Sequence, residues 1–408
     1  MFRKLLLSSL LAAALAFSAG SRAQGIRIAV VGPMAYVQGE NHWAGAEMAR
    51  DEINQAGGIA VGGARRPIEL LRVDTNEIQS VADATFAAET VISRDKADFL
   101  VGGFRSEAVL AMQEIAMNHR KLFLGVGSAH GKLGQNVQAR YERYKYWFMV
   151  YPTKSADLGR TLFAVLDSIA DQVRRERKKE TPRVAIFAER AAWTEPIIKA
   201  VQENLPKLRM EAAGVWQTTE RSTDVSGELE AIKRAGADIV FTLVSGPLGG
   251  TLGRQMGEQN SPAAAFGINV EAQKDSFWNA TGGKAGHVAM PDTYADVEIT
   301  PKTIAFLKEF RARYKRSPGY TAATYDAVMI LKSAIEQAGS TDADKLVAVI
   351  EKMEHVGSAA TASWDKNHDL IWAEGKTAGI AVQWQDGQKV PFWPPQVKGM
   401  KPFRLPVP

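Results

Sequence analysis

The chain has 408 residues, of which 46% are hydrophobic and 23% charged, and it contains no cysteine. This length and composition fit about two to three folded domains and exclude disulfide-stapled scaffolds, thiolate catalysis and thiolate metal sites. The formal net charge is +5, and removal of the three basic residues among the first 23 lowers it to +2. That balance gives no reason to expect a nucleic-acid partner.

Residues 1–23 have the layout of a secretory signal peptide. Arg3 and Lys4 precede a mostly apolar stretch, and small residues lead to Ala23. The apolar stretch, from Leu5 to Phe17, is shorter than the roughly 20 residues that span a bilayer. We therefore expect cleavage before Gln24 and export of the mature chain, to the periplasm in a Gram-negative cell.

After residue 24, short β-branched runs alternate with helical patterns, which is typical of βαβ units around a mostly parallel sheet. The first part of the chain predicts strands at 26–31, 68–73, 99–101 and 122–126, and helices at 40–56, 80–93 and 107–119. These elements make one doubly wound half.

The alternation starts afresh from Pro152. It predicts helices at 157–170, 195–205, 226–235 and 248–258, and strands at 184–187, 212–215, 239–243 and 264–268. The charged segment 174–180 is expected to be a solvated helix end. Three more helices follow at 302–314, 322–338 and 342–354, and the Pro-rich end, 391–408, is expected to be an extended tail. The sequence thus predicts an α/β fold with two doubly wound, Rossmann-like lobes.

Ligands of open parallel sheets bind beyond the carboxyl ends of the strands, where helix N-termini point N–H groups into the crevice. In the first lobe, the loops at those ends are 32–36, 102–107 and 127–130. Their glycines allow a close approach of the backbone, and Ser106 and Ser128 offer hydroxyl groups. A helix start at Glu107 favours an anion by about 0.3–2 kcal/mol. These loops therefore predict a site for a carboxylate.

Several segments carry a family resemblance. GAEMARDEINQAGGI at 45–59, followed by PIEL at 67–70, resembles the opening of periplasmic binding proteins of the leucine/isoleucine/valine type. Further landmarks of that family, in the same order, are similar to YWF at 146–148, DLG at 157–159, YDA at 325–327, WD at 364–365 and DL at 369–370. The resemblance covers nearly the whole mature chain.

The resemblance implies a type I binding-protein fold, in which a three-strand hinge joins two lobes. Lobe 1 is expected at 24–150 plus 292–370, and lobe 2 at 151–291 plus 371–408. The implied function is capture of an amino acid, or a related carboxylate or amide, by closure of the hinge, followed by docking to an inner-membrane ABC permease. We expect a monomer that has no enzyme activity, no cofactor and no metal.

The resemblance also places contacts on this sequence. The family's carboxylate-holding serine falls on Ser106, the paired contacts of the next loop fall on Gly127 and Ala129, and aromatic contacts fall on Tyr36 and Trp193. With the residues that flank these positions, the expected ligand-binding residues are Tyr36, Phe104, Arg105, Ser106, Gly127, Ser128, Ala129, Trp193, Ser245 and Asn269.

Three of these positions depart from the amino-acid binders. Those relatives commonly have threonine in place of Ala129, an aromatic residue in place of Ser245, and an ammonium-binding acidic residue in place of Asn269. An ammonium closed in a cleft without an acceptor keeps its desolvation cost, so an α-amino acid ligand is in question. Three other acidic residues are alternative acceptors for an ammonium: Glu40, Glu107 and Glu271. Arg105 has two interpretations, a bidentate grip on a carboxylate or a rim position that points to water.

Two other classes of protein are alternatives. A hydrolase with Ser128 as nucleophile is disfavoured, because Val126 and His130 occupy the positions where a nucleophile elbow has glycine. The six histidines are scattered without metal-ligand spacing, and the glycine-rich loops lack the P-loop motif. A sensor that presents its ligand to a membrane receptor needs the same closure and stays open.

Overall fold

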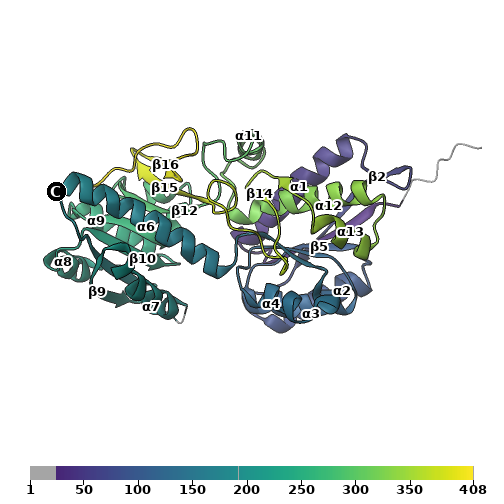
Figure 1. The fold of residues 1–408 in the computed structure, drawn as a ribbon, viewed down its shortest axis with the longest axis horizontal. Coiled ribbons are helices and arrows are strands. Elements are labelled where there is room, and N and C mark those ends of the chain that lie inside the picture. Colours follow the sequence, from purple (N-terminus) through teal and green to yellow (C-terminus); the bar gives the residue numbers. More distant parts are fainter. Residues whose placement is uncertain (1–23, 192, 408) are drawn as a thin grey trace, which may run out of the picture.

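A computed structural model describes residues 24–191 and 193–407. The predicted signal peptide and its cleavage site lie outside these ranges. Within them, no helix combines the length and the apolar character needed to cross a membrane. The chain forms two bodies, each built on its own large sheet, which lie side by side in Figure 1.

The first body, which we call lobe 1, has a five-stranded parallel sheet in the order β4-β1-β5-β6-β7. Its strands are β1 (Ile26–Gly32), β4 (Ile68–Asp74), β5 (Phe99–Gly102), β6 (Phe123–Val126) and β7 (Trp147–Tyr151). Every residue of β5, β6 and β7 is buried, as expected for parallel strands covered on both faces.

Helices cover both faces of the lobe 1 sheet. Figure 1 shows α1 and α12 on one face and α2 and α3 on the other. The helices of this lobe are α1 (Val37–Gln55), α2 (Val81–Ser93), α3 (Ser106–Asn118), α4 (Lys132–Ala139), α5 (Tyr141–Tyr144), α11 (Thr303–Tyr314), α12 (Thr324–Ala338) and α13 (Ala343–Ile350), with a 3₁₀ turn η3 (Tyr320–Ala323). Two hairpins complete it, β2 (Ile59–Val61) with β3 (Ala64–Arg66), and β13 (His355–Val356) with β14 (Thr361–Ala362).

The second body, lobe 2, has a seven-stranded sheet in the order β16-β15-β12-β11-β10-β8-β9. Its strands are β8 (Arg183–Glu189), β9 (Glu211–Thr218), β10 (Ile239–Val244), β11 (Ala264–Asn269), β12 (Val288–Asp292), β15 (Ile380–Gln385) and β16 (Gln388–Trp393). Its helices are α6 (Ser155–Arg177), α7 (Thr194–Asn204), α8 (Ser226–Arg234), α9 (Leu248–Glu258) and α10 (Phe277–Ala280), with 3₁₀ turns η1 (Pro206–Leu208) and η2 (Glu271–Gln273).

The chain passes between the lobes three times: after β7, after β12, and before β15. The first and second crossovers meet at Tyr151, whose hydroxyl accepts a hydrogen bond of 3.1 Å from Thr293 Oγ1. Since both crossovers leave from the carboxyl ends of parallel strands, those ends of the two sheets face the junction of the lobes. The loops at these ends are the ones that the sequence selects as ligand loops.

The alternating helices and strands of the sequence prediction are present, and α6 continues to Arg177 into the predicted charged helix end. The prediction of an extended tail at 391–408 is wrong for its first part. Pro391 and Trp393 pair with β15, and the side chains of Phe392, Trp393 and Phe403 are buried. Proline is tolerated there because β16 is an edge strand.

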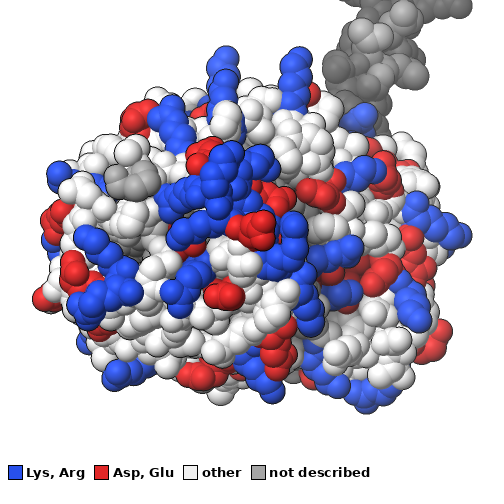
Figure 2. All heavy atoms as spheres, turned by 60° about the vertical axis from the view of Figure 1, so that its left-hand side comes forward, with Lys and Arg blue, Asp and Glu red and all other residues white. Residues whose placement is uncertain are grey.

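The surface carries charges of both signs. On the face that Figure 2 shows, Lys and Arg gather near the centre, with Asp and Glu at the borders of this group. Ion pairs such as Lys179 with Asp238, at 2.6 Å, combine the two signs. This intermingling agrees with the small net charge.

Candidate functional site

Two serines at the carboxyl edge of the lobe 1 sheet form the centre of the site. Ser106 is the first residue of α3, the helix that follows β5, and Ser128 follows the neighbouring strand β6. Their hydroxyl oxygens lie 3.1 Å apart, and Ser128 is buried. Among the described residues, the backbone N–H groups of Ser128 and Ala129 have no protein acceptor. Hydroxyls, free N–H groups and a helix N-terminus together suit a carboxylate.

Glycines bring the two serine loops into contact. Gly127 has a φ of +129°, and a Cβ there would lie 2.4 Å from the carbonyl oxygen of Gly103. Its N–H donates a hydrogen bond of 2.7 Å to the Tyr151 carbonyl, at the first crossover. Glycine is needed at residue 127 for both its conformation and this close approach.

Buried His42 of α1 contacts the end of β6, next to the second serine loop. Its Nε2–H donates a hydrogen bond of 2.7 Å to the carbonyl of Val126, the residue before Gly127. Burial lowers the pKa of His42 to about 4, so the ring is neutral at physiological pH.

Glu77, in the loop between β4 and α2, holds the β5–α3 loop. Its Oε2 accepts hydrogen bonds from the backbone N–H groups of Phe104, at 3.1 Å, and Arg105, at 2.7 Å. Burial raises the pKa of Glu77, and these hydrogen bonds oppose the rise. Sequence reasoning missed this residue, although its loop also lies at the carboxyl edge of the sheet.

The guanidinium of Arg105 bonds to its own lobe. Its Nε donates to Glu107 at 3.2 Å and its Nη1 donates to the Ile78 carbonyl at 2.8 Å. The side chain is 44% exposed. This placement favours the rim interpretation over the bidentate grip.

The placement of Arg105 leads to a prediction. Arg105→Ala should weaken carboxylate binding less than about twofold, whereas Ser106→Ala should weaken it about tenfold, since a hydrogen bond to a charged group contributes about 1.5–3 kcal/mol. Calorimetric titration of both variants with one bound acid measures the difference. A larger loss in Arg105→Ala than in Ser106→Ala would contradict this arrangement.

In lobe 2, a second buried glutamate binds two of the predicted residues. Glu189, at the end of β8, accepts hydrogen bonds from Trp193 Nε1 at 2.7 Å, from the Ser245 N–H at 2.7 Å and from Ser245 Oγ at 2.6 Å. The predicted contact Asn269 is also bound internally: its Nδ2 donates to the Gly249 carbonyl at 3.3 Å and its Oδ1 accepts from the Ala272 N–H at 3.2 Å. The polar groups of these three predicted residues thus already have partners within lobe 2.

Aromatic side chains flank the serine loops. The Phe104 ring lies 6.5 Å from that of Tyr320, whose hydroxyl donates a hydrogen bond of 3.4 Å to the Gly127 carbonyl. Tyr36 is 38% exposed and its hydroxyl accepts from Gln79 Nε2 at 3.0 Å. Tyr320 was not predicted, because it precedes the YDA landmark by several residues and has no motif of its own.

A hollow of about 360 Å³ lies between the lobes beside these loops. Lobe 1 contributes Val37, which follows Tyr36, together with residues 316–321, and lobe 2 contributes Val270, which follows Asn269, together with residues 273–276. At its rim, Asp275 of lobe 2 accepts a hydrogen bond of 2.8 Å from the Ser317 N–H of lobe 1. None of the ten predicted residues lines this hollow, although Tyr36 and Asn269 are the chain neighbours of two residues that do.

Nine of the ten predicted residues thus follow the carboxyl ends of strands, and Asn269 is the last residue of β11. The structure brings Ser106 to Ser128, and Trp193 and Ser245 to Glu189. No hydrogen bond within the described ranges joins the side chain of Tyr36 or Asn269 to another predicted residue.

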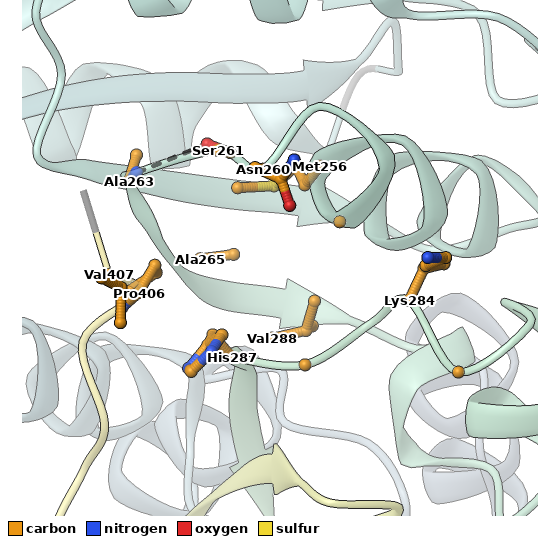
Figure 3. A pocket seen from close by; sticks show the side chains of 13 residues that line it. Met256, Asn260, Ser261, Ala263, Ala265, Lys284, His287, Val288, Pro406 and Val407 are labelled. Atoms are coloured by element: carbon orange, nitrogen blue, oxygen red, sulfur yellow. Dashed lines mark hydrogen bonds between the residues drawn. The ribbon is translucent and has the colours of Figure 1, made fainter.

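Another hollow, shown in Figure 3, lies at the opposite end of the lobe 2 sheet. Met256, Lys284 and His287 line it, together with Pro406 and Val407 near the C-terminus. It opens at the amino ends of β11 and β12, away from the ligand loops, so it is separate from the candidate site.

The residues around the serine loops do not form a nucleophile and base. The Nδ1 of His130 accepts a hydrogen bond of 3.1 Å from the Lys132 N–H, and the His130 N–H lies 3.4 Å from Ser128 Oγ. Over the described ranges, no cluster of three or more His, Cys, Asp or Glu residues is arranged to hold a metal ion. The geometry suits binding of an anion.

Comparison with known proteins agrees with the fold. A family model described as periplasmic binding protein matches residues 25–388. The chain is 24% identical to an amino acid binding protein of Pseudomonas aeruginosa, over 95% of this chain and 98% of the relative. It is also 24% identical to Leu/Ile/Val-binding protein homolog 3 of Brucella melitensis, over 92% and 99% of the two chains.

Solved structures show the same architecture. A putative branched-chain amino acid ABC transporter protein from Silicibacter pomeroyi superposes with a TM-score of 0.80 at 20% identity, covering 94% of this chain and 99% of that one. A solute-binding protein from R. palustris in complex with benzoate has a TM-score of 0.65 at 17% identity, covering 90% and 95%. The predicted two-lobed α/β fold is confirmed.

Proposed function

Because the chain belongs to the periplasmic binding protein family, we propose that it captures a small carboxylate-bearing or amide solute between its lobes and delivers it to an ABC permease of the inner membrane. The observation that carries the ligand class is the pair of hydroxyls of Ser106 and Ser128, 3.1 Å apart at the start of α3. The pair lies on the edge of lobe 1 that faces the junction with lobe 2.

Capture proceeds by rotation about the three crossovers. Lobe 1, at 24–150 plus 292–370, binds the carboxylate first, and lobe 2, at 151–291 plus 371–408, closes over the rest of the solute. Closure removes water from the site and strengthens the hydrogen bonds to the anion. The layout of residues 1–23 supports action in the periplasm, and we propose that the protein acts there as a monomer.

The lobe 2 contacts favour a ligand without an ammonium group. The Glu189 carboxylate already accepts three hydrogen bonds, and the side chain of Asn269 is also satisfied. At position 269, where relatives commonly have an ammonium-binding acid, an ammonium would instead meet an amide whose hydrogen bonds are made within lobe 2, and it would keep its desolvation cost. One relative is named for Leu/Ile/Val binding, and one similar structure contains benzoate. The test therefore includes both amino acids and acids without an ammonium group.

The test is a thermal-shift screen followed by calorimetry, since a ligand that binds the folded state raises the melting temperature. Leucine and 4-methylpentanoate form a matched pair that differs in the ammonium group, and benzoate and benzamide differ in the carboxylate. We expect 4-methylpentanoate to raise the melting temperature more than leucine. Stabilisation by none of a broad panel of acids and amides would contradict the function, and tighter binding of leucine would contradict the ligand class.

A further inference from the structure

Glu77 has an unusual environment for a carboxylate. The residue has no exposed surface; it belongs to the β4–α2 loop and contacts the β5–α3 loop, which is the proposed carboxylate loop. Besides the N–H groups of Phe104 and Arg105, which bond to Oε2, the Thr75 hydroxyl donates a hydrogen bond of 2.9 Å to Oε1. The side chain thereby fixes the two residues that immediately precede Ser106.

The charge of Glu77 has no ion-pair partner within the described ranges. The Arg105 guanidinium, in the β5–α3 loop, bonds instead to Glu107 and to the Ile78 carbonyl. Burial raises the pKa of Tyr320, and the charge of Glu77 raises it further. Tyr320 in turn donates its hydrogen bond to the carbonyl of Gly127, in the second serine loop.

We propose that Glu77 is a positioning and specificity-determining residue: its hydrogen bonds hold the carboxylate loop in place, while its negative charge lowers the affinity for anionic ligands relative to neutral ones. This inference rests on the proposed function. The two effects have opposite signs for a carboxylate, so substitutions separate them.

Glu77→Gln removes the charge and keeps the shape. The amide oxygen accepts both backbone N–H groups, and the amide NH₂ donates to the Thr75 hydroxyl. We expect carboxylate affinity to rise about three- to tenfold, because a negative charge close to the bound anion is removed. The affinity for the matching neutral amide should stay within about twofold. A purely structural role would leave the ratio of the two affinities unchanged.

Glu77→Ala removes the hydrogen bonds as well as the charge. We expect both ligands to bind at least about tenfold more weakly, because the loop loses the acceptor of two N–H groups. Glu77→Asp keeps the charge and shortens the side chain, so it tests the loss of the hydrogen bonds alone if the alanine variant does not fold, and it should also weaken the binding of both ligands. Glu69→Gln, at an exposed carboxylate on β4, is the control for loss of one charge and should change neither affinity.

The measurement is calorimetric titration of the wild type and variants with benzoate and benzamide, or with the acid and amide that the screen selects. Glu77→Gln should fold with a melting temperature at least equal to that of the wild type, because a buried unpaired charge is removed. A folded variant whose carboxylate affinity is unchanged or lower overturns the proposal, and so does a variant that unfolds. Absence of any binding to the wild type instead contradicts the proposed function itself.

Discussion

Gly127→Ala is expected to lower carboxylate affinity by about 100-fold. The added Cβ would lie 2.4 Å from the Gly103 carbonyl oxygen, and the φ of +129° disfavours any residue other than glycine. Relief of this contact moves the β5–α3 and β6–α4 loops apart and separates the hydroxyls of Ser106 and Ser128. Calorimetry with the selected acid measures the loss, and circular dichroism monitors the fold.

Gly131→Ala is the matched control in the same loop. A Cβ at Gly131 would meet no atom within 4 Å, and its φ of −61° is ordinary for alanine. This variant should bind like the wild type. Equal affinities of the Gly127 and Gly131 variants would remove the β6–α4 loop from the site.

His42 is expected to make folding stability depend on pH. Its pKa falls from an ordinary 6.5 to about 4 in the folded protein, so the unfolded chain binds more protons between these values. The contribution of neutral His42 to the free energy of unfolding is about 3 kcal/mol. It is fully present above pH 6.5 and is lost as the pH falls toward 4.

The comparison with His42→Gln isolates this contribution. Denaturant unfolding of both proteins at pH 7.5 and pH 4 gives the difference in free energy of unfolding at each pH. Glutamine does not titrate. The free energy of unfolding of the wild type, relative to that of the variant, should therefore fall by about 3 kcal/mol between pH 7.5 and pH 4. Other titrating groups, such as Asp369, cancel in this difference. An advantage that is the same at both pH values would mean that His42 is not buried in the neutral form.

The fold and the core of the site were predictable because both depend on local sequence order. Strands such as β5 and β6 are apolar runs that end in glycine-containing loops, and parallel packing brings their carboxyl ends to one edge. The proximity of Ser106 to Ser128 follows from that arrangement alone.

The missed features depend on partners that no pattern encodes. In the sequence, Glu77 and Glu189 resemble solvent-exposed charges. In the structure both carboxylates are buried, and they accept hydrogen bonds from backbone N–H groups that lie 27 and 56 residues away in the chain. The Arg105 side chain had two interpretations because its acceptor at Ile78 is a backbone carbonyl, which carries no residue signature. The prediction of an extended tail at 391–408 was wrong because its proline content indicated a tail, although the segment also contains the apolar residues of β16.

The central claim, that the lobes close on a bound solute, is tested most directly by a distance measurement between them. The chain has no cysteine, so Ala82→Cys on α2 and Lys233→Cys on α8, both exposed, give one spin label on each lobe. Double electron–electron resonance with saturating acid should show a shorter and narrower distance distribution than without it. An unchanged distribution, at a concentration where calorimetry shows the site to be filled, would contradict capture by closure.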